Sequence, residues 1–536
     1  MRAHSLILLL LFSTSVWAKP YAPADGESIY RQGVLSSGTT IRAEREPGIS
    51  IEGAEAACVN CHRRSGLGSA EGRYKIPPIT GKYLFRPSGN NIESSSISYL
   101  KGVQSNRTAY TDAALVRAIR DGVNPDGRDL SFLMPRFKLN DEEMNSLISY
   151  LKGLSNNQVP GVTDDTLHFA TVITPDSDPI KRQGMLDVLD HYFASHNAFY
   201  RESPKLHATR GIMYRVNTKW QLHVWELTGP PDTWERQLHK HLVTEPVFAV
   251  ISGIGGKSWA PVHQFCEHES VPCLFPNVDL PVVAEKDFYS IYFSKGVLLE
   301  AELISNRIAE ERNRAELHSV IQVFRKGDIG EEAANLVSNM MVTQHMAVAN
   351  HVLAEDNPRQ ELLELLKKAE PDSVIILWLR PQDLAALPPT TEPRQLVLIS
   401  GLMGSLESLR LPADWRNSTS MAYPLDLPDR RRIRMNFATS WFRIQHIAVV
   451  DEHVQTDTYL ACNILAETLG EMLDVFVRDY LVERVEDMLN HVTATGYYPR
   501  LGLAPGQRFA SKGGYLVHFA DPEGSRLLAD GDWMVP

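Results

Sequence analysis

The sequence predicts a multidomain protein in which an all-α amino-terminal domain precedes a two-lobed α/β domain with parallel sheets. The 536 residues are too many for one hydrophobic core, because single domains hold roughly 100–200 residues. A polar stretch with Pro and Gly at 155–165 separates a mainly helical pattern from a long alternation of short apolar runs and amphipathic helices. We therefore expect domains at 19–154 and 166–536, joined by a linker at 155–165.

Composition and charge exclude several classes of protein. The chain is 43% hydrophobic and 22% charged, which is typical of globular proteins and excludes disordered and collagen-like chains. Its formal net charge of -11 argues against a nucleic-acid partner, since such binding depends on neutralising phosphates. We expect an acidic globular protein that binds no nucleic acid.

Residues 1–18 have the pattern of a secretory signal peptide. Arg2 precedes an apolar run at 6–12, and Val16 and Ala18 stand before a cleavage site at Lys19. An uncleaved anchor is the alternative, but the apolar run falls well short of the roughly 20 residues that span a bilayer. We predict a cleaved signal peptide and a periplasmic protein that does not span the membrane.

The segment Cys58-Val59-Asn60-Cys61-His62 has the Cys-x-x-Cys-His arrangement of c-type haem attachment. Two thiols three positions apart can bond the two vinyl groups of one porphyrin, and the adjoining His62 then lies beside the iron as an imidazole ligand. A redox or zinc-binding Cys-x-x-Cys is the alternative, which an exported chain with a second haem ligand disfavours. The sequence predicts one covalently attached haem c.

The second ligand of the haem iron is predicted at Met134, on a loop ahead of a helix. That helix is capped by Asn140 or Asp141, and its apolar stripe includes Met144. Met144 is the rival ligand, but its helical spacing is typical of a core residue. With His62 and Met134 as axial ligands, the domain would carry electrons rather than bind oxygen.

Further residues around the haem motif match a known family. Gly26 and Tyr30 match an amino-terminal helix whose glycine permits close crossing by a carboxy-terminal helix, and Tyr150 matches the partner aromatic. Pro77, in Pro-Pro-Ile-Thr-Gly, is similar to that family's Pro-x-Leu-x-Gly. The domain thus resembles a class I cytochrome c, which implies an electron-transfer fold in which the Pro77 carbonyl orients the His62 ring.

Basic residues surround the haem motif, whereas the second half of the chain is acidic. They can steer an acidic periplasmic redox partner, or the acidic half of this chain, onto the haem edge. A solvated surface that balances the haem propionates explains them equally well. These basic residues are Arg63, Arg64, Arg73, Lys75 and Lys82.

From residue 167 onward, short apolar runs alternate with amphipathic helical stretches, a pattern typical of β-α-β units and parallel sheets. A long helical segment, 296–316, interrupts this alternation, which then resumes. We therefore expect two lobes with a ligand cleft beyond the carboxyl ends of their strands. Strands are expected at 167–173, 211–216, 247–251, 273–276, 319–324, 342–348, 373–379 and 396–400. Helices are expected at 178–194, 233–242, 259–268, 330–340 and 359–369.

The order of these elements, the loop 250–258 and the turn 276–279 resemble those of type 1 periplasmic substrate-binding proteins, in the branch of the leucine/isoleucine/valine receptors. A final strand-turn-strand at 498–519 also looks like that family's carboxy terminus. The resemblance implies a small-molecule ligand, an anion or an amino-acid-like metabolite, because glycine amides and serine hydroxyls suit a carboxylate. The implied ligand contacts are Ser252, Gly255, Gly256, Ser258, Asn277 and Asp328.

Three cysteines lie outside the haem motif. Cys266 and Cys273 either form a disulfide or are two separately buried thiols, and both readings stay open. Cys462 lies in an apolar helical stretch and is expected in the core. The histidines that fit no zinc pattern, and are expected on solvated helix faces, are His239, His241, His263 and His268.

The sequence favours a periplasmic c-type cytochrome that transfers electrons through a His/Met-ligated haem and is fused to a small-molecule binding or docking module. The alternative is a solute-binding receptor of a transport or sensing system with an accessory haem domain. The second half contains no acid, base or nucleophile constellation, so we do not expect an enzyme.

Overall fold

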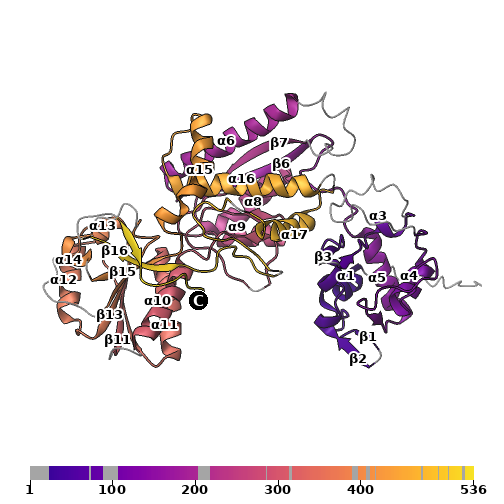
Figure 1. The fold of residues 1–536 in the computed structure, drawn as a ribbon, viewed down its shortest axis with the longest axis horizontal. Helices are drawn as coiled ribbons and strands as arrows, with labels where there is room; N and C mark the ends of the chain where they lie inside the picture. The colour runs from indigo at the N-terminus through magenta and orange to yellow at the C-terminus, as the bar shows by residue number, and fades with distance from the viewer. Residues whose placement is uncertain are drawn as a thin grey trace, which may run out of the picture. The chain divides into compact units, whose positions relative to one another are not determined.

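The computed structural model forms two compact units, of which one ends at Asn157 and the other begins at Gln158 (Figure 1). This boundary falls inside the predicted linker. The predicted signal peptide, 1–18, and the predicted strand 211–216 lie outside the described residues. None of the helices in the described part of the chain has the length and apolar character needed to cross a membrane. The structure describes residues 23–46, 48–71, 74–87, 107–202, 218–284, 286–312, 317–388, 396–405, 411–416, 418–472, 475–492, 494–504, 506–521 and 526–536.

The first unit is built on helices around one hydrophobic core, but it is not all-α as predicted. Two small antiparallel sheets are added, one with the strand order β2-β1-β5 and one that pairs β3 with β4. Pairing of β1 with β2 satisfies the backbone hydrogen bonds of the long stretch that precedes the Cys-x-x-Cys-His motif. The alternating side chains of Ile41 and Ala43 are buried in the core. The helices are α1 (Pro23–Gln32), α2 (Val59–His62), α3 (Gly81–Leu84), α4 (Asp112–Arg120) and α5 (Asp141–Gly153). The strands are β1 (Arg42–Glu46), β2 (Ile49–Glu52), β3 (Ser69–Glu71), β4 (Tyr74–Ile76) and β5 (Arg136–Phe137).

The first and last helices of this unit, α1 and α5, cross at Gly26. A Cβ atom added to Gly26 would lie 2.2 Å from the Ser146 carbonyl oxygen and 2.7 Å from Tyr150 Cβ, so only glycine allows this approach. The Tyr30 and Tyr150 rings pack beside the crossing with centroids 5.4 Å apart. The structure thus brings together the glycine and the two aromatic residues that the sequence pattern singled out.

The first lobe of the second unit contains a five-stranded parallel sheet with the strand order β10-β9-β8-β6-β7. In Figure 1, α6 and α16 run side by side along this lobe. The strands are β6 (Thr166–Ile173), β7 (Lys219–Glu226), β8 (Ala249–Ile251), β9 (Cys273–Leu274) and β10 (Ser290–Ile291). The helices are α6 (Pro179–Glu202), α8 (Trp234–Thr244), α9 (Ala260–His268), α15 (Pro428–Ile444), α16 (Glu452–Met472) and α17 (Arg478–Leu489).

The second lobe contains a seven-stranded sheet with the order β12-β11-β13-β14-β15-β16-β17. It is parallel as far as β15, and β16 and β17 add antiparallel strands from the end of the chain. The strands are β11 (Ser319–Phe324), β12 (Ala347–Val352), β13 (Ser373–Trp378), β14 (Val397–Ser400), β15 (Thr419–Tyr423), β16 (Tyr515–Phe519) and β17 (Leu527–Ala529). The helices are α10 (Val297–Arg312), α11 (Ile329–Thr343), α12 (Pro358–Lys368), α13 (Pro381–Leu384) and α14 (Ala413–Arg416).

The predicted two-lobed α/β architecture with parallel sheets is confirmed, and three local predictions were wrong. The strand expected at 342–348 begins later, because α11 continues to Thr343 and leaves Ala347–Val352 as the strand. β7 at Lys219–Glu226 was not predicted, although Trp220, Leu222 and Val224 alternate with polar residues as in a half-buried strand. In the expected strand-turn-strand at 498–519, only Tyr515–Phe519 is a strand, and it pairs with β17 beyond that range.

Candidate functional site

The first unit encloses an apolar cavity of about 380 Å³ at the haem motif. Cys58, Cys61 and His62 line it from one side, and Met134 and Pro77 also contribute to its wall. All five residues predicted to hold haem are therefore brought around one cavity. The remaining wall is largely apolar and includes Leu84, Leu115, Ile119, Leu130, Leu147 and Leu151.

The His62 ring is held in a defined orientation at this cavity. It ends the short helix α2, is 9% exposed, and has its Nδ1 atom 3.1 Å from the Pro77 carbonyl oxygen. Burial lowers the pKa of His62 to about 4, which keeps the imidazole neutral. With Nδ1–H donating to Pro77, the lone pair of Nε2 is left for a metal.

The two candidate methionines differ in their surroundings. Met134 lies in a turn, is partly buried and lines the cavity. Met144 is 1% exposed and belongs to the hydrophobic core, on the helix α5 that an Asn140–Glu143 capping box begins. The geometry therefore supports Met134 as the soft second ligand and gives Met144 a packing role.

The donor set and the cavity wall fit a covalently attached haem. Two thiols stand three positions apart at the start of α2, an oriented imidazole follows directly, and a thioether lies in the wall of the same apolar cavity. A zinc site would need four clustered polar ligands instead of an extended apolar wall. In this unit the residues present match the chemistry of c-type haem binding.

The second unit contains a larger cleft, about 680 Å³, lined by residues of both lobes. Its wall is formed where strands end: Asp176 follows β6, Gly255 and Gly256 follow β8, and Arg325 and Arg380 follow β11 and β13. This placement is the one expected for ligand sites in open parallel sheets.

Four of the six predicted ligand contacts line the cleft, namely Gly255, Gly256, Asn277 and Asp328. The other two described residues, Ser252 and Ser258, are not among the residues that line it. Ser252 is fully buried, and its Oγ donates to Thr458 Oγ1 at 2.9 Å and accepts from Asn277 Nδ2 at 3.0 Å. Its hydroxyl ties the end of β8 to α16, so the structure does not place Ser252, a predicted ligand contact, at the cleft wall.

The predicted amide cradle after β8 is already used by the protein. Asp176 Oδ2 accepts from the Lys257 backbone N–H at 2.7 Å, and the Gly256 N–H donates to Thr174 Oγ1 at 3.2 Å. The Gly255 N–H donates to the Asn277 carbonyl oxygen at 3.3 Å. Thr174 Oγ1 in turn donates to Asp176 Oδ1 at 2.5 Å. Partial burial opposes the ionisation of Asp176, but the Lys257 N–H and the Thr174 hydroxyl outweigh it and lower the pKa of its carboxyl group. In this structure these amides are therefore not free to bind a ligand carboxylate.

Two arginine–aspartate pairs form the wall of the second lobe. Arg380 binds Asp328 through Nε and Nη2 at 3.0 and 2.8 Å, and Asp328 also caps α11 by accepting from Ile329 N–H at 2.8 Å. Arg325 binds Asp383 in the same bidentate way, at 3.1 and 2.5 Å. Because each arginine is matched by a carboxylate, this wall is polar but locally neutral.

One further part of the cleft wall is formed by α16 and by a loop near the end of the chain. Asp457 is 6% exposed and accepts a hydrogen bond from Tyr498 Oη at 2.7 Å. His453 Nε2 lies 3.4 Å from the same carboxylate oxygen, Oδ2, that accepts from Tyr498. Burial opposes protonation of His453, but the Asp457 carboxylate outweighs burial and raises the pKa of His453.

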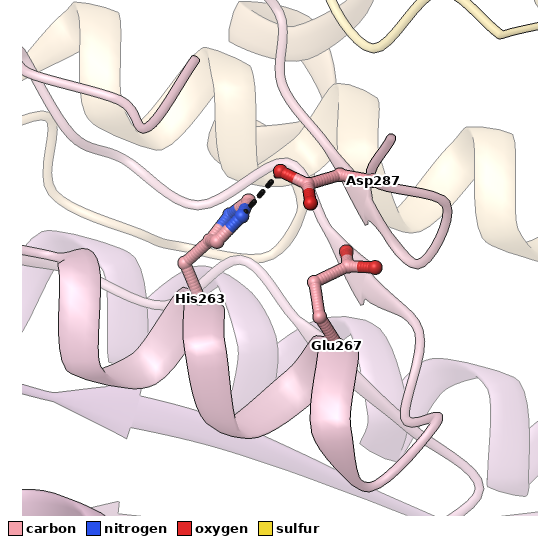
Figure 2. A group of neighbouring side chains, drawn as sticks. All are labelled: His263, Glu267 and Asp287. Atoms are coloured by element: carbon pink, nitrogen blue, oxygen red, sulfur yellow. Dashed lines mark hydrogen bonds and ion pairs between the residues drawn. The ribbon is translucent and has the colours of Figure 1, made fainter. Parts of the chain in front are cut away.

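A group of His263, Glu267 and Asp287 has the spacing of a metal site, with ligand atoms within 4.8 Å of one another (Figure 2). Its members are already satisfied by protein groups. His263 contacts Tyr292 Oη and Asp287 Oδ2, both at 2.7 Å, and Glu267 accepts from backbone N–H groups at Phe288, Tyr289 and Ser290. His263 is 3% exposed, so its predicted place on a solvated helix face was wrong. We assign the group a structural role in fastening α9 to the segment before β10.

The cysteines outside the haem motif are buried free thiols in this structure. Cys266 and Cys273 lie within hydrogen-bond reach of each other, and this contact together with burial raises the pKa of Cys266. Cys462 is fully buried in α16, as predicted for a core residue.

Several cleft residues were not found from the sequence. Asp176, Arg325 and Arg380 each follow a strand by one to three residues, so reading the three residues after every predicted strand would have found them. Asp457 and Tyr498 carried no such signal, because they come from a helix and a loop that return to the cleft late in the chain.

No family model and no curated protein matches the chain. Among solved structures, a fatty acid ABC transporter substrate-binding protein from Thermomonospora curvata is similar to 71% of this chain over 95% of its own length, with a TM-score of 0.52 and 14% identity. A leucine-binding protein from Thermotoga maritima (69% and 99% covered, TM-score 0.46, 10% identity) has a lower score. A branched-chain amino acid ABC transporter protein from Thermus thermophilus with bound valine also has a lower score (70% of this chain and 98% of that chain covered, TM-score 0.47, 10% identity). The two-lobed part of the chain thus has the fold of the type 1 periplasmic substrate-binding proteins.

Proposed function

We propose that the chain is an exported solute-binding protein whose second unit captures a small polar solute between its two lobes. The observation that carries this proposal is the cleft of about 680 Å³, lined from both lobes at the carboxyl ends of their strands. The fold shared with a fatty acid transporter's substrate-binding protein supports the same reading. The solute would serve a transport or sensing system in the periplasm.

Solute capture is tested by native mass spectrometry of the gently purified full chain. A retained small molecule is expected, and it should be lost when Ser177, a cleft residue, is replaced in Ser177→Trp, because the indole fills the cleft. Thr343→Trp, at the exposed end of α11, is the matched control and should retain it. A chain that neither retains a solute nor gains thermal stability from any added solute contradicts the proposal, since a ligand at about 100 times its Kd adds about 2.7 kcal/mol.

We further propose that the first unit carries one haem c and exchanges electrons with a periplasmic redox protein. Cys58 and Cys61 would hold the group covalently, with His62 and Met134 as its axial ligands. A haem with both axial positions filled supplies one-electron transfer. The chain's own contribution is to orient the His62 ring through Pro77 and to exclude water with an apolar wall.

The assignment of the second ligand is tested by making the same substitution at two methionines. Met134→Leu removes the cavity thioether, so the absorbance spectrum is expected to lose its low-spin features and the reduction potential to fall. Met144→Leu conserves the volume of a core side chain and is expected to change neither. Identical spectra for Met134→Leu and the unaltered protein would remove Met134 from the ligand set.

A further inference from the structure

The cleft offers a carboxylate ligand few free donors on the side of the first lobe. The backbone N–H groups of Gly255, Gly256 and Lys257 all donate to acceptors within the protein. A Cβ atom added to Gly256 would lie 2.6 Å from Asp176 Oδ2, which shows how closely this carboxylate is seated against the loop. The chain's own Asp176 therefore takes the place that a ligand anion would need.

Two carboxylate groups elsewhere in the cleft, those of Asp457 and Asp279, are less fully satisfied than that of Asp176. Asp457 Oδ1 is buried and has no hydrogen-bond partner among the described residues. Asp279 also lines the cleft, and its carboxylate makes no hydrogen bond or ion pair within the described part of the chain. Both act electrostatically on Tyr498, whose hydroxyl donates to Asp457. A buried carboxylate oxygen without a donor is costly unless a ligand supplies one.

The cationic side chains near Asp457 and Asp279 do not supply the missing hydrogen-bond donor. His453 Nε2 forms an ion pair with Asp457 Oδ2 at 3.4 Å, which leaves Oδ1 without a partner, and Lys181 from α6 and Asp451 also act on His453. On the second lobe, Arg325 and Arg380 are already bound to Asp383 and Asp328. The other lysines of the cleft wall, Lys257 and Lys326, are exposed.

Aromatic rings complete the same region of the cleft. Phe293 is stacked with both Phe275 and Tyr498, at centroid distances of 4.3 and 5.3 Å, and Tyr498 lines the cleft together with Phe293 and Tyr292. Aromatic faces beside carboxylates attract organic cations, because the ring quadrupole and the negative charge act in the same direction.

We propose that the cleft selects a cationic solute, an organic ammonium compound whose charged group is held by Asp279, Asp457 and the Tyr498 ring. The inference rests on the proposed solute-binding function and narrows it to one class of ligand. The ammonium group supplies the hydrogen-bond donor that Asp457 Oδ1 lacks. Because the backbone N–H groups of Gly255, Gly256 and Lys257 already donate within the protein, a carboxylate on the solute would find no free donor among them.

The test compares matched ammonium and carboxylate probes on the full chain. Choline, putrescine and linear alkylammonium chlorides of two to eight carbons are added at about 10 mM, each alkylammonium beside the carboxylate of the same length. At least one ammonium probe is expected to raise the melting temperature of the second unit by about 2 °C or more, with the matched carboxylate inactive. Calorimetric titration of that probe is expected to show at least a tenfold loss of affinity in Asp457→Asn and in Asp279→Asn. The loss should be absent in Asp429→Asn, an exposed residue of α15 outside the cleft wall.

Each outcome separates this inference from the proposed function. Binding of carboxylates but not of ammonium probes overturns the cationic class and leaves solute capture standing. Ammonium binding that is unchanged in both Asp457→Asn and Asp279→Asn overturns the site. If neither class of probe binds and no solute is retained by the purified chain, both proposals fail. Because two independent variants are compared, misfolding of one still leaves the other to decide.

Discussion

Replacing both Cys58 and Cys61 with alanine is expected to abolish covalent haem attachment completely. The two thiols are three positions apart at the start of α2 and line the same cavity as His62. Without them no bond to the porphyrin can form, and the imidazole alone would hold haem reversibly. The measurement is haem-specific staining of the denatured full chain, together with its intact mass.

The matched control for this experiment is Cys462→Ala. Cys462 is fully buried in the second unit, and burial raises the pKa of its thiol far above the neutral range. The substitution removes a cysteine without touching the cavity, so staining and haem mass should be retained. Covalent haem in the Cys58/Cys61 double variant, or its absence from the unaltered exported protein, would contradict the haem proposal for the first unit.

Part of the cavity at the Cys-x-x-Cys-His motif could be predicted from the sequence because three of its residues are constrained at short range. Cys58, Cys61 and His62 are fixed relative to one another by one helical turn, whereas Pro77 lies 15 residues beyond His62, after β3 and β4. Met134 was identified by its loop context, which distinguishes a ligand from the periodic core position of Met144. The two small sheets were missed because strands of four or five residues carry little periodic signal.

The cleft was predicted less well, because its chemistry depends on contacts between distant segments. The glycines at 255 and 256 were correctly placed at the cleft wall, but their N–H groups are satisfied by a threonine and a carbonyl oxygen that sequence alone does not bring near. Ser252 was assigned to ligand binding, whereas its partner Thr458 lies about two hundred residues away. Positions after predicted strands are therefore reliable for locating a cleft, and the free donors and acceptors within it require the tertiary structure.

A buried carboxyl group near the cleft predicts a strong pH dependence of stability. Glu300 on α10 is fully buried, accepts from Leu402 N–H at 2.9 Å and hydrogen-bonds with Ser400 Oγ. Burial raises its pKa to about 8, and the nearby Asp279 adds to the shift, although hydrogen bonds from Ser400 and Leu402 oppose it. The folded protein therefore holds a proton on Glu300 at neutral pH that an unfolded chain, with the ordinary glutamate pKa of 4.5, releases.

The sign of the effect follows from this difference in bound protons. Between about pH 4.5 and 8 the folded state binds more protons at Glu300 than the unfolded state, so its contribution to stability falls as the pH rises and levels off above pH 8. The decrease is roughly 1.4 kcal/mol for each pH unit inside that window. Glu300→Gln keeps an acceptor for Leu402 and removes the titration. The free energy of unfolding of the variant is therefore expected to rise, relative to that of the unaltered protein, by that amount for each pH unit.

Urea unfolding of both proteins at pH 5, 6, 7 and 8 measures this difference directly, because other titrating groups cancel in the comparison. Glu302→Gln is the control on the same helix, where Glu302 forms an ion pair with Lys295 at 2.7 Å. Its free energy of unfolding should differ from that of the unaltered protein by a nearly constant amount across the series. A constant difference for Glu300→Gln as well would mean that Glu300 is ionised in the folded protein. The polar groups around it, Ser400 and the Gly401 and Leu402 N–H donors, would then outweigh its burial.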